Sequence, residues 1–295
     1  MTKTDTATPG LAYLETRRLE VDALLDKYLP AESVYPRRLH QAMRYSVLAG
    51  GKRIRPILMI TAYEAFGGTA SDIIEPAACA VEMIHTYSLI HDDLPCMDDD
   101  ELRRGLPTLH VKFDEACAVL AGDALHDLAF ELLAHSGSAR AVAELARAIG
   151  TAGMIGGQFA DVAAEGKQVT LDEITYIHAH KTGALIRACL RIGAILANVD
   201  EQTLERLTQY GEKIGFAFQI IDDILDVEGD QKELGKKIGS DCKNLKATYP
   251  GTVGLEQSRT DAERIIEEAV AISREFDLKD NYFEQIARFI GWRKK

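Results

Sequence analysis

Apolar side chains recur every three or four residues over several long stretches of this sequence. The leucines of residues 11–29 follow this spacing among charged residues, and the apolar residues of 203–228 and 260–275 do the same. Residues 115–135 and 139–155 are rich in alanine and leucine. This periodicity indicates amphipathic helices rather than strands, in which apolar residues alternate. We therefore predict an all-α protein with helices over these five stretches.

The breaks between these stretches are short glycine or proline turns. No linker is long enough to divide the chain, so we predict a flexible polar tail over residues 1–10 and a single helical domain over 11–295. The longest loop-like segment is 229–251, which is rich in glycine, lysine and aspartate. A segment of this kind is suited to a mobile lid.

The composition limits the kinds of partner. The 295 residues are 46% hydrophobic and 27% charged, which is ordinary for a folded protein, and the formal net charge is −12. Such an acidic chain lacks the basic surface that binds nucleic acids or anionic membranes. We therefore expect neither as the main partner. An anionic ligand would need local lysines, arginines or metal ions.

The cysteines favour a reducing compartment. Their number is odd, and no CxxC pair occurs among Cys79, Cys96, Cys117, Cys189 and Cys242. This disfavours a disulfide framework or a zinc site and favours a cytoplasmic location. The first ten residues lack the apolar core of a signal peptide, and no apolar run of about 18 residues predicts a membrane-spanning helix.

Two acidic clusters stand within otherwise apolar helical stretches. The first is HDDLPCMDDD at residues 91–100, and the second is QIIDDILD at 219–226. Most acidic runs are solvated surface. These two differ because strongly apolar segments, 81–90 and 216–221, lead into them. We therefore treat both clusters as candidate ligand sites.

The spacing of the first cluster does not decide its geometry. Pro95 cannot donate the helical hydrogen bond and should distort the helix. Regular helical phasing therefore does not apply beyond it, and the spacing leaves open which later aspartate converges on Asp92. The candidates are Asp98, Asp99 and Asp100.

The second cluster is simpler. Asp222 and Asp226 are four residues apart and share a helical face, where two carboxylates repel each other unless a cation relieves them. The candidate ligands are all carboxylates, without histidine or cysteine at ligand spacing, which favours Mg²⁺ over Zn²⁺ or iron. Because Mg²⁺ usually completes its shell with water and substrate phosphate, the clusters predict a phosphorylated substrate.

Four basic motifs complement the acidic clusters. GGKRIRP at 50–56 combines glycines, which let a ligand approach the backbone, with side chains that bind phosphate. RRG at 103–105, KTG at 181–183 and GKKIG at 235–239 are weaker signals. Helix capping or surface charge pairing explains each motif alone. Together they predict a site for two anionic substrates, one held through metal and one held by side chains.

The order of these motifs resembles that of the trans-type isoprenyl (polyprenyl) diphosphate synthases, and among them the bacterial farnesyl diphosphate synthases. The aspartate-rich motifs read DDLPCMD and DDILD here, with GGKRIRP upstream and RRG and KTG between them. The resemblance extends from about Tyr35 to the C-terminus. It implies the isoprenoid synthase fold, which is a helical bundle around a deep central cavity, and usually a homodimer.

The resemblance implies head-to-tail (1′–4) condensation of isopentenyl diphosphate with dimethylallyl or geranyl diphosphate, giving farnesyl diphosphate and releasing diphosphate. Ionisation of the allylic C–O bond produces a carbocation and a more highly charged diphosphate, which metal ions, lysine and arginine stabilise. The isopentenyl double bond attacks the cation, and a proton is lost. Three Mg²⁺ ions are implied when substrate is bound.

The resemblance also implies roles for individual residues. Asp92 and Asp98 would bind Mg²⁺ that bridges the allylic diphosphate. Asp222, and Asp226 through water, would serve the third Mg²⁺. Near the developing carbocation would lie Thr182 and Gln219.

The remaining implied contacts concern the two diphosphates. The residues that would contact the allylic diphosphate are Arg103, Lys181, Lys236 and Lys246. The residues that would hold isopentenyl diphosphate are Lys52, Arg55, His85 and Arg104. A further family motif, in a supporting role, is matched by Gly157, Gln158 and Asp161.

Product length should depend on residues just before the first motif. Tyr87 and Ser88 lie five and four residues before Asp92, roughly one turn down the same helical face. The resemblance implies that a bulky Tyr87 forms a floor that stops growth near C15. Three alternatives remain. They are a geranyl or geranylgeranyl diphosphate synthase, a class I terpene cyclase, which would not need GGKRIRP, and a catalytically silent subunit, which should have lost aspartates that are intact here.

Overall fold

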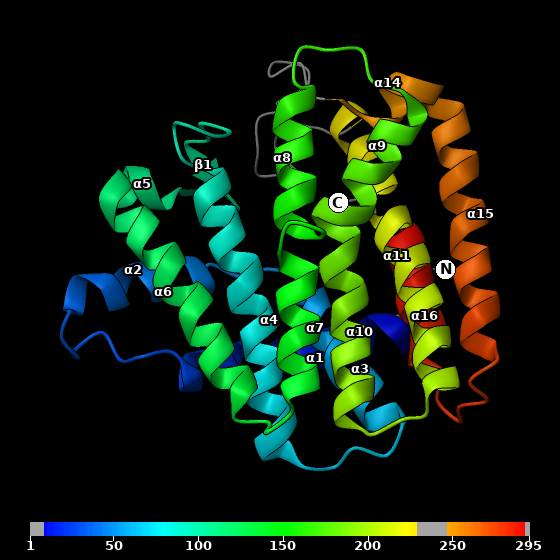
Figure 1. Ribbon diagram of the computed structural model, residues 1–295, viewed down its shortest axis with the longest axis horizontal. Helices are drawn as coiled ribbons and strands as arrows, with labels where there is room; N and C mark the ends of the chain where they lie inside the picture. The colour runs from blue at the N-terminus through cyan, green and yellow to red at the C-terminus, as the bar shows by residue number, and fades with distance from the viewer. Residues whose placement is uncertain (1–8, 229–246, 293–295) are drawn as a thin grey trace, which may run out of the picture.

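The structure is a computed structural model that describes residues 9–228 and 247–292, most of them in helices (Figure 1). The first helices are α1 (Pro9–Tyr28), α2 (Arg37–Val47), α3 (Ile54–Ala65), α4 (Ser71–Asp92), α5 (Leu109–Lys112), α6 (Glu115–Ala134) and α7 (Ala139–Ile149). They are followed by α8 (Met154–Ala164), α9 (Leu171–Ile177), α10 (Ala184–Leu196), α11 (Glu201–Glu228), α14 (Tyr249–Val253), α15 (Leu255–Arg274) and α16 (Tyr282–Trp292). A π-helix, η1 (His178–Gly183), joins α9 to α10, and β1 (Leu102–Arg103) pairs with β2 (Leu106–Pro107) in a small antiparallel hairpin.

The long helices stand side by side as a bundle (Figure 1). α4 packs against α3 and α6, α10 packs against α3 and α11, and α11 also packs against α15. The C-terminal ends of α4 and α11 lie at the same end of the bundle, which is uppermost in Figure 1. This arrangement brings together the two acidic clusters, which are far apart in the sequence.

A continuous core of buried apolar side chains joins the helices. Some helices approach so closely that only glycine fits between them. A Cβ atom at Gly193 on α10 would lie 2.3 Å from the carbonyl oxygen of Met59 on α3, well inside van der Waals contact. The prediction of an all-α bundle around a central cavity is confirmed. Among the helices in the described ranges, none combines the length and the apolar character needed to cross a membrane.

Four of the five predicted helical stretches are confirmed, with ends shifted by a few residues, as α1, α6, α11 and α15. The prediction of one helix over 139–155 is wrong, because α7 ends at Ile149 and α8 begins at Met154. A Cβ atom at Gly153 would lie 2.1 Å from the carbonyl oxygen of Ala148. The sharp turn between the two helices therefore requires glycine, although the sequence on both sides favours helix.

Candidate active site

One large cavity, with a volume of about 600 Å³, is bounded by residues of α3, α4, β1, α8, η1 and α11. Its size is typical of small-molecule sites. Most of the described side chains that the sequence singled out contribute to its wall. They are Lys52, Arg55, His85, Asp92, Asp98, Arg103, Arg104, Asp161, Lys181, Thr182, Gln219, Asp222 and Asp226. Carboxylates and cations therefore share one cavity.

The helix that carries the first acidic cluster ends within the cluster, before Pro95. α4 ends at Asp92, and the chain then turns so that the Asp98 amide donates to the Asp92 carbonyl oxygen at 2.8 Å. The stop follows from proline, which disfavours helical conformation in the residue before it. Asp99 has a left-handed φ of 51° and is exposed outside the cavity wall. The turn thus places Asp98, of the three candidates, in the wall beside Asp92.

Asp93 was missed by the sequence analysis. It is buried, and its carboxylate accepts a hydrogen bond from Arg103 Nε at 2.6 Å and lies 2.5 Å from Nη2 of the same guanidinium. Burial raises the pKa of Asp93, although Arg103 opposes this shift. The pair fixes the Arg103 guanidinium at the cavity wall. The sequence did contain an indication of this difference. Consecutive residues of a helix point about 100° apart, so Asp93 was not expected to face the same side as Asp92.

The second acidic cluster lies in regular helix, and Asp222 and Asp226 both line the cavity with Asp92 and Asp98. Within the described ranges, no three acidic, histidine or cysteine side chains come close enough to form a metal site by themselves. An oxygen-only set of this kind fits Mg²⁺, which takes one or two carboxylates and completes its shell with water and phosphate oxygens. The residues therefore fit Mg²⁺ that binds together with a phosphorylated ligand.

Asp223, also missed by the sequence analysis, organises a buried hydrogen-bond network. Its Oδ1 accepts from Gln219 Nε2 at 2.9 Å, and its Oδ2 accepts from the backbone amide of Tyr249 at 2.8 Å. The Nε2 atom of His178 lies 3.2 Å from the same Oδ2. Gln219 Oε1 in turn accepts from the Thr182 hydroxyl at 2.7 Å. The network therefore fixes the two side chains, Thr182 and Gln219, that were expected near a carbocation.

Lys181 reaches the cavity from the π-helix η1. Its Nζ donates to Asp161 Oδ2 on α8 at 2.5 Å. Gly157 permits this approach, because a Cβ atom there would lie 2.1 Å from the backbone nitrogen of Lys181. Burial by itself would lower the pKa of Lys181, but Asp161 and, less strongly, Asp92 raise it. Lys181 is therefore a cation at neutral pH.

A second group of cations surrounds His85. Lys52 lies two residues before α3 and Arg55 in its first turn, and the side chain of Arg104 donates from the hairpin to the carbonyl oxygen of Gly50. Burial lowers the pKa of His85 well below its usual value, and Arg55 and Arg104 lower it further. His85 is therefore neutral near pH 7 and contributes one donor and one acceptor. This cluster can bind a second anionic group without metal.

The two residues predicted to control product length lie outside the wall of the cavity, as do Gly157 and Gln158. Tyr87 is buried between α4 and α6, with its ring edge-to-face to that of His126 and 5.2 Å between centroids. Its hydroxyl has no hydrogen-bond partner in the part of the chain that the structure describes, and burial raises its pKa to about 12. Ser88 donates to the carbonyl oxygen of His85 at 2.9 Å.

Three further predictions fall wholly or mostly outside the described residues. They concern Lys236, Lys246 and the lid over 229–251. Only the end of the predicted lid is described, where residues 247–248 lead into α14.

Comparison with known proteins identifies the family. A sequence profile of the polyprenyl synthetases matches residues 36–286. The chain is 50% identical over 271 residues to "Heterodimeric geranylgeranyl pyrophosphate synthase large subunit 1, chloroplastic" of Arabidopsis thaliana, covering 88% of this chain and 72% of the relative. It is 44% identical over 290 residues to the farnesyl diphosphate synthase of Bacillus subtilis, covering 96% and 97% of the two chains.

A solved structure gives the same result. The geranyltransferase of Helicobacter pylori, complexed with magnesium and isoprenyl diphosphate, superposes with a TM-score of 0.83 at 33% identity, over 97% of this chain and 98% of that chain. The named relatives include both farnesyl and geranylgeranyl diphosphate synthases, so they agree on the type of reaction and differ in product length. The chain belongs to the polyprenyl synthetase family and is a prenyltransferase of the trans-isoprenyl diphosphate synthase type.

Proposed function

We propose that the protein condenses isopentenyl diphosphate with dimethylallyl or geranyl diphosphate to give farnesyl diphosphate and diphosphate, with Mg²⁺ as its metal and in the cytoplasm. The observation that carries the proposal is a single cavity lined by carboxylates suited to a metal-bound diphosphate and by a separate group of cations. A terpene cyclase would use the first set only. The second set, around His85, supports a second diphosphate substrate.

The allylic diphosphate would bind between the acidic clusters. The metal ligands would be Asp92, Asp98, Asp222 and Asp226. Bound Mg²⁺ would supply Lewis-acid stabilisation of the leaving diphosphate. Arg103, fixed by Asp93, and Lys181, fixed by Asp161, would donate to the same group. Because these cations are already oriented, they would stabilise the developing charge with little reorganisation.

The carbocation would form beside Thr182 and Gln219. Both line the cavity, and the Thr182 hydroxyl is oriented by its hydrogen bond to Gln219. Their oxygen dipoles would stabilise positive charge without a protein nucleophile. The apolar side chains of Leu89, Phe218 and Leu225 also line the cavity and would exclude water, which otherwise quenches a carbocation.

Isopentenyl diphosphate would be held by the second set of cations. Lys52, Arg55 and Arg104 would contact its diphosphate, and neutral His85 would add a hydrogen bond without a charge. The double bond would attack the carbocation at C1, and the proton lost from the adduct would pass to the released diphosphate.

A product assay tests the proposal. The protein is incubated with Mg²⁺, labelled isopentenyl diphosphate and either allylic starter, and the dephosphorylated products are sized by chromatography. A dominant C15 alcohol that disappears with chelator is expected. A C10 or C20 product would keep the condensation and overturn the product assignment. Absence of incorporation would favour a silent subunit, and consumption of the allylic substrate alone would favour a cyclase.

The C15 limit rests on Tyr87, whose ring fills space between α4 and α6. A growing chain would have to displace this ring to extend further. Replacement Tyr87→Ala should therefore shift the main product to C20 or longer. The matched control is Tyr176→Ala, because Tyr176 on α9 is 44% exposed and does not line the cavity. An unchanged C15 product from the Tyr87 variant would remove Tyr87 from the proposal.

The protein is also proposed to act as a homodimer. On α8, Ile155, Phe159 and Val162 are spaced along one helical face and are 49%, 77% and 41% exposed. An exposed apolar stripe of this kind is suited to pairing with a second copy. Sedimentation equilibrium should give twice the chain mass, and Phe159→Asp should weaken the association. A monomer at micromolar concentration would contradict this.

A further inference from the structure

Arg53 lies between two of the basic residues proposed to bind isopentenyl diphosphate, Lys52 and Arg55, but its side chain is completely buried. It precedes α3 and has left-handed backbone angles, φ 53° and ψ 31°. This conformation is uncommon for a residue other than glycine and needs support from the surroundings. Unlike Lys52 and Arg55, Arg53 has no role implied by the family resemblance.

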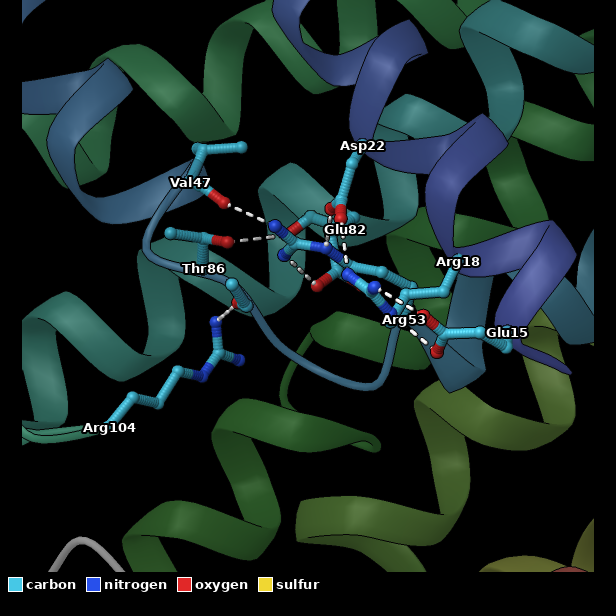
Figure 2. Close-up of polar contacts among 9 residues, drawn as sticks. Glu15, Arg18, Asp22, Val47, Arg53, Glu82, Thr86 and Arg104 are labelled. Carbon is cyan, nitrogen blue, oxygen red and sulfur yellow. Dashed lines mark hydrogen bonds and ion pairs between the residues drawn. The ribbon is translucent and has the colours of Figure 1, made fainter. Parts of the chain in front are cut away.

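The Arg53 guanidinium joins the three helices α1, α2 and α4 (Figure 2). Its Nε donates to Asp22 Oδ1 on α1 at 2.8 Å, and its Nη1 donates to Glu82 Oε1 on α4 at 2.7 Å. Its Nη2 donates to the carbonyl oxygen of Val47, the last residue of α2, at 2.7 Å. Arg18 Nη1 donates to the other carboxylate oxygen of Asp22, Oδ2, at 2.8 Å. Only a planar guanidinium presents three nitrogens in this fixed arrangement.

The turn before Arg53 is also held from its other side. Arg104 donates to the carbonyl oxygen of Gly50 (Figure 2). Gly51 has a φ of 139°, and a Cβ atom there would lie 2.9 Å from the guanidinium carbon of Arg104. The backbone of residues 50–53 is therefore held between two arginines that both border the cavity, of which Arg53 is completely buried.

The carboxylates that bind Arg53 also influence the charges beside the proposed site of the second diphosphate. Burial by itself would lower the pKa of Arg53, but Glu82 and Asp22 raise it. Burial lowers the pKa of Arg55, and Glu82 opposes that shift as well. In the part of the chain that the structure describes, Arg55 Nε is buried without a hydrogen-bond partner. A buried donor of this kind at the wall of a cavity fits an anionic ligand.

We propose that Arg53 is a positioning residue for the second diphosphate. It fixes the left-handed turn before α3, from which Lys52 and Arg55 line the cavity. Arg53 also borders the cavity, but its side chain is inaccessible to solvent and all three of its nitrogens donate to protein acceptors, so it acts through its neighbours. The assignment of that diphosphate to isopentenyl diphosphate rests on the proposed function. Loss of the three-way contact should therefore weaken binding of isopentenyl diphosphate and leave the allylic site, built on Arg103 and Lys181, nearly unchanged.

The test is Arg53→Lys, which keeps the charge but cannot reach all three acceptors at once. The KM for isopentenyl diphosphate should rise about tenfold, as expected for the loss of one well-placed charged contact, while the KM for geranyl diphosphate stays within about twofold. The matched control is Arg191→Lys. Arg191 donates to Glu144 at 2.5 Å and to Thr208 at 2.6 Å and does not line the cavity. This control should lower stability but leave both KM values unchanged.

A milder variant covers the case in which Arg53→Lys fails to fold. Asp22→Asn keeps an acceptor for Arg53 at a site that is 30% exposed, and should raise the same KM by a smaller factor. Equal changes in both KM values, or none, in these variants would overturn the inference.

Calorimetric titration with isopentenyl diphosphate separates the inference from the proposed function. Weaker binding to Arg53→Lys than to the unmodified protein supports the inference even where no condensation is observed. Condensation by the unmodified protein together with unchanged binding to the variant would overturn the inference alone. Absence of binding to the unmodified protein would overturn both.

Discussion

The two acidic clusters use the same residue type in nearly the same order, but the chain folds differently around them. The first begins at the last residue of α4 and is completed by a turn that returns Asp98 to Asp92. The second lies entirely within α11, where Asp222 and Asp226 are one turn apart. In both clusters the outer aspartates line the cavity.

The inner aspartates differ more than the outer ones. Asp93 is paired with a guanidinium, that of Arg103, whereas Asp223 accepts from a side-chain amide and a backbone amide and also contacts His178. Each cluster therefore divides two tasks between its residues: the outer aspartates line the cavity as the proposed metal ligands, and the inner aspartate orients a neighbouring side chain. Substitutions should therefore separate loss of activity from loss of stability.

The largest effect is expected at an outer aspartate. Asp92→Asn removes a charged ligand from the proposed metal site and should lower turnover by roughly 100- to 1,000-fold, with the fold intact by circular dichroism. The control is Asp99→Asn on the same turn, because Asp99 is exposed and asparagine tolerates its left-handed φ. Similar turnover in the two variants would mean that Asp92 does not bind the metal.

The next effect concerns the ion pair in the first cluster. Asp93→Asn leaves the Arg103 guanidinium without its main carboxylate. Because the side chains of Asp93 and Arg103 are 5% and 22% exposed, we expect a loss of about 2 kcal/mol in the free energy of unfolding, measured with urea. Asp100→Asn is the control. Asp100 lies 3.6 Å from the same guanidinium at a more exposed position, and its loss should cost less than about 0.5 kcal/mol.

A smaller loss of stability is expected in the second cluster. Asp223→Asn removes one acceptor oxygen, but Gln219 and the Tyr249 amide carry no formal charge that would be left unpaired. The expected loss in the free energy of unfolding is about 1 kcal/mol. A loss larger than that of Asp93→Asn would contradict the distinction between the two inner aspartates.

Regular helical spacing predicted the individual helices and the shared face of Asp222 and Asp226, and the family resemblance predicted their arrangement as a bundle. Helical spacing could not decide the first cluster, where only the family resemblance indicated Asp98, since the position of Asp98 depends on a backbone hydrogen bond to Asp92 and on the left-handed Asp99. Pro95 shows that the helix must end, but not how the chain returns.

The residues that orient others were missed for a different reason. The carboxylate partners of Arg53 come from α1 and α4, and one partner of Asp223 comes from α14. Pairings between distant segments leave no periodic signal in a single sequence. The break between α7 and α8 was missed because the alanine-rich pattern continues on both sides of Gly153.

The smallest expected effect is a change in how stability depends on pH, and it concerns a histidine. His85, near the first cluster, lies among arginines, whereas His178, near the second, contacts Asp223. In the folded protein, burial and the charges of Arg55 and Arg104 lower the pKa of His85. In the unfolded chain, the pKa of a histidine is about 6.5. Below that pH the unfolded chain binds a proton that the folded protein does not, so stability is full above about pH 6.5 and falls as the pH decreases towards the folded pKa. The Tm of the His85→Gln variant should therefore fall less than that of the unmodified protein between about pH 7 and pH 5.

Replacement of the exposed His135 by Gln is the control, and the Tm of this variant should change with pH as that of the unmodified protein does. Parallel curves for all three proteins would show that His85 binds its proton equally well in the folded and unfolded states, and that the arginines around it do not keep it neutral.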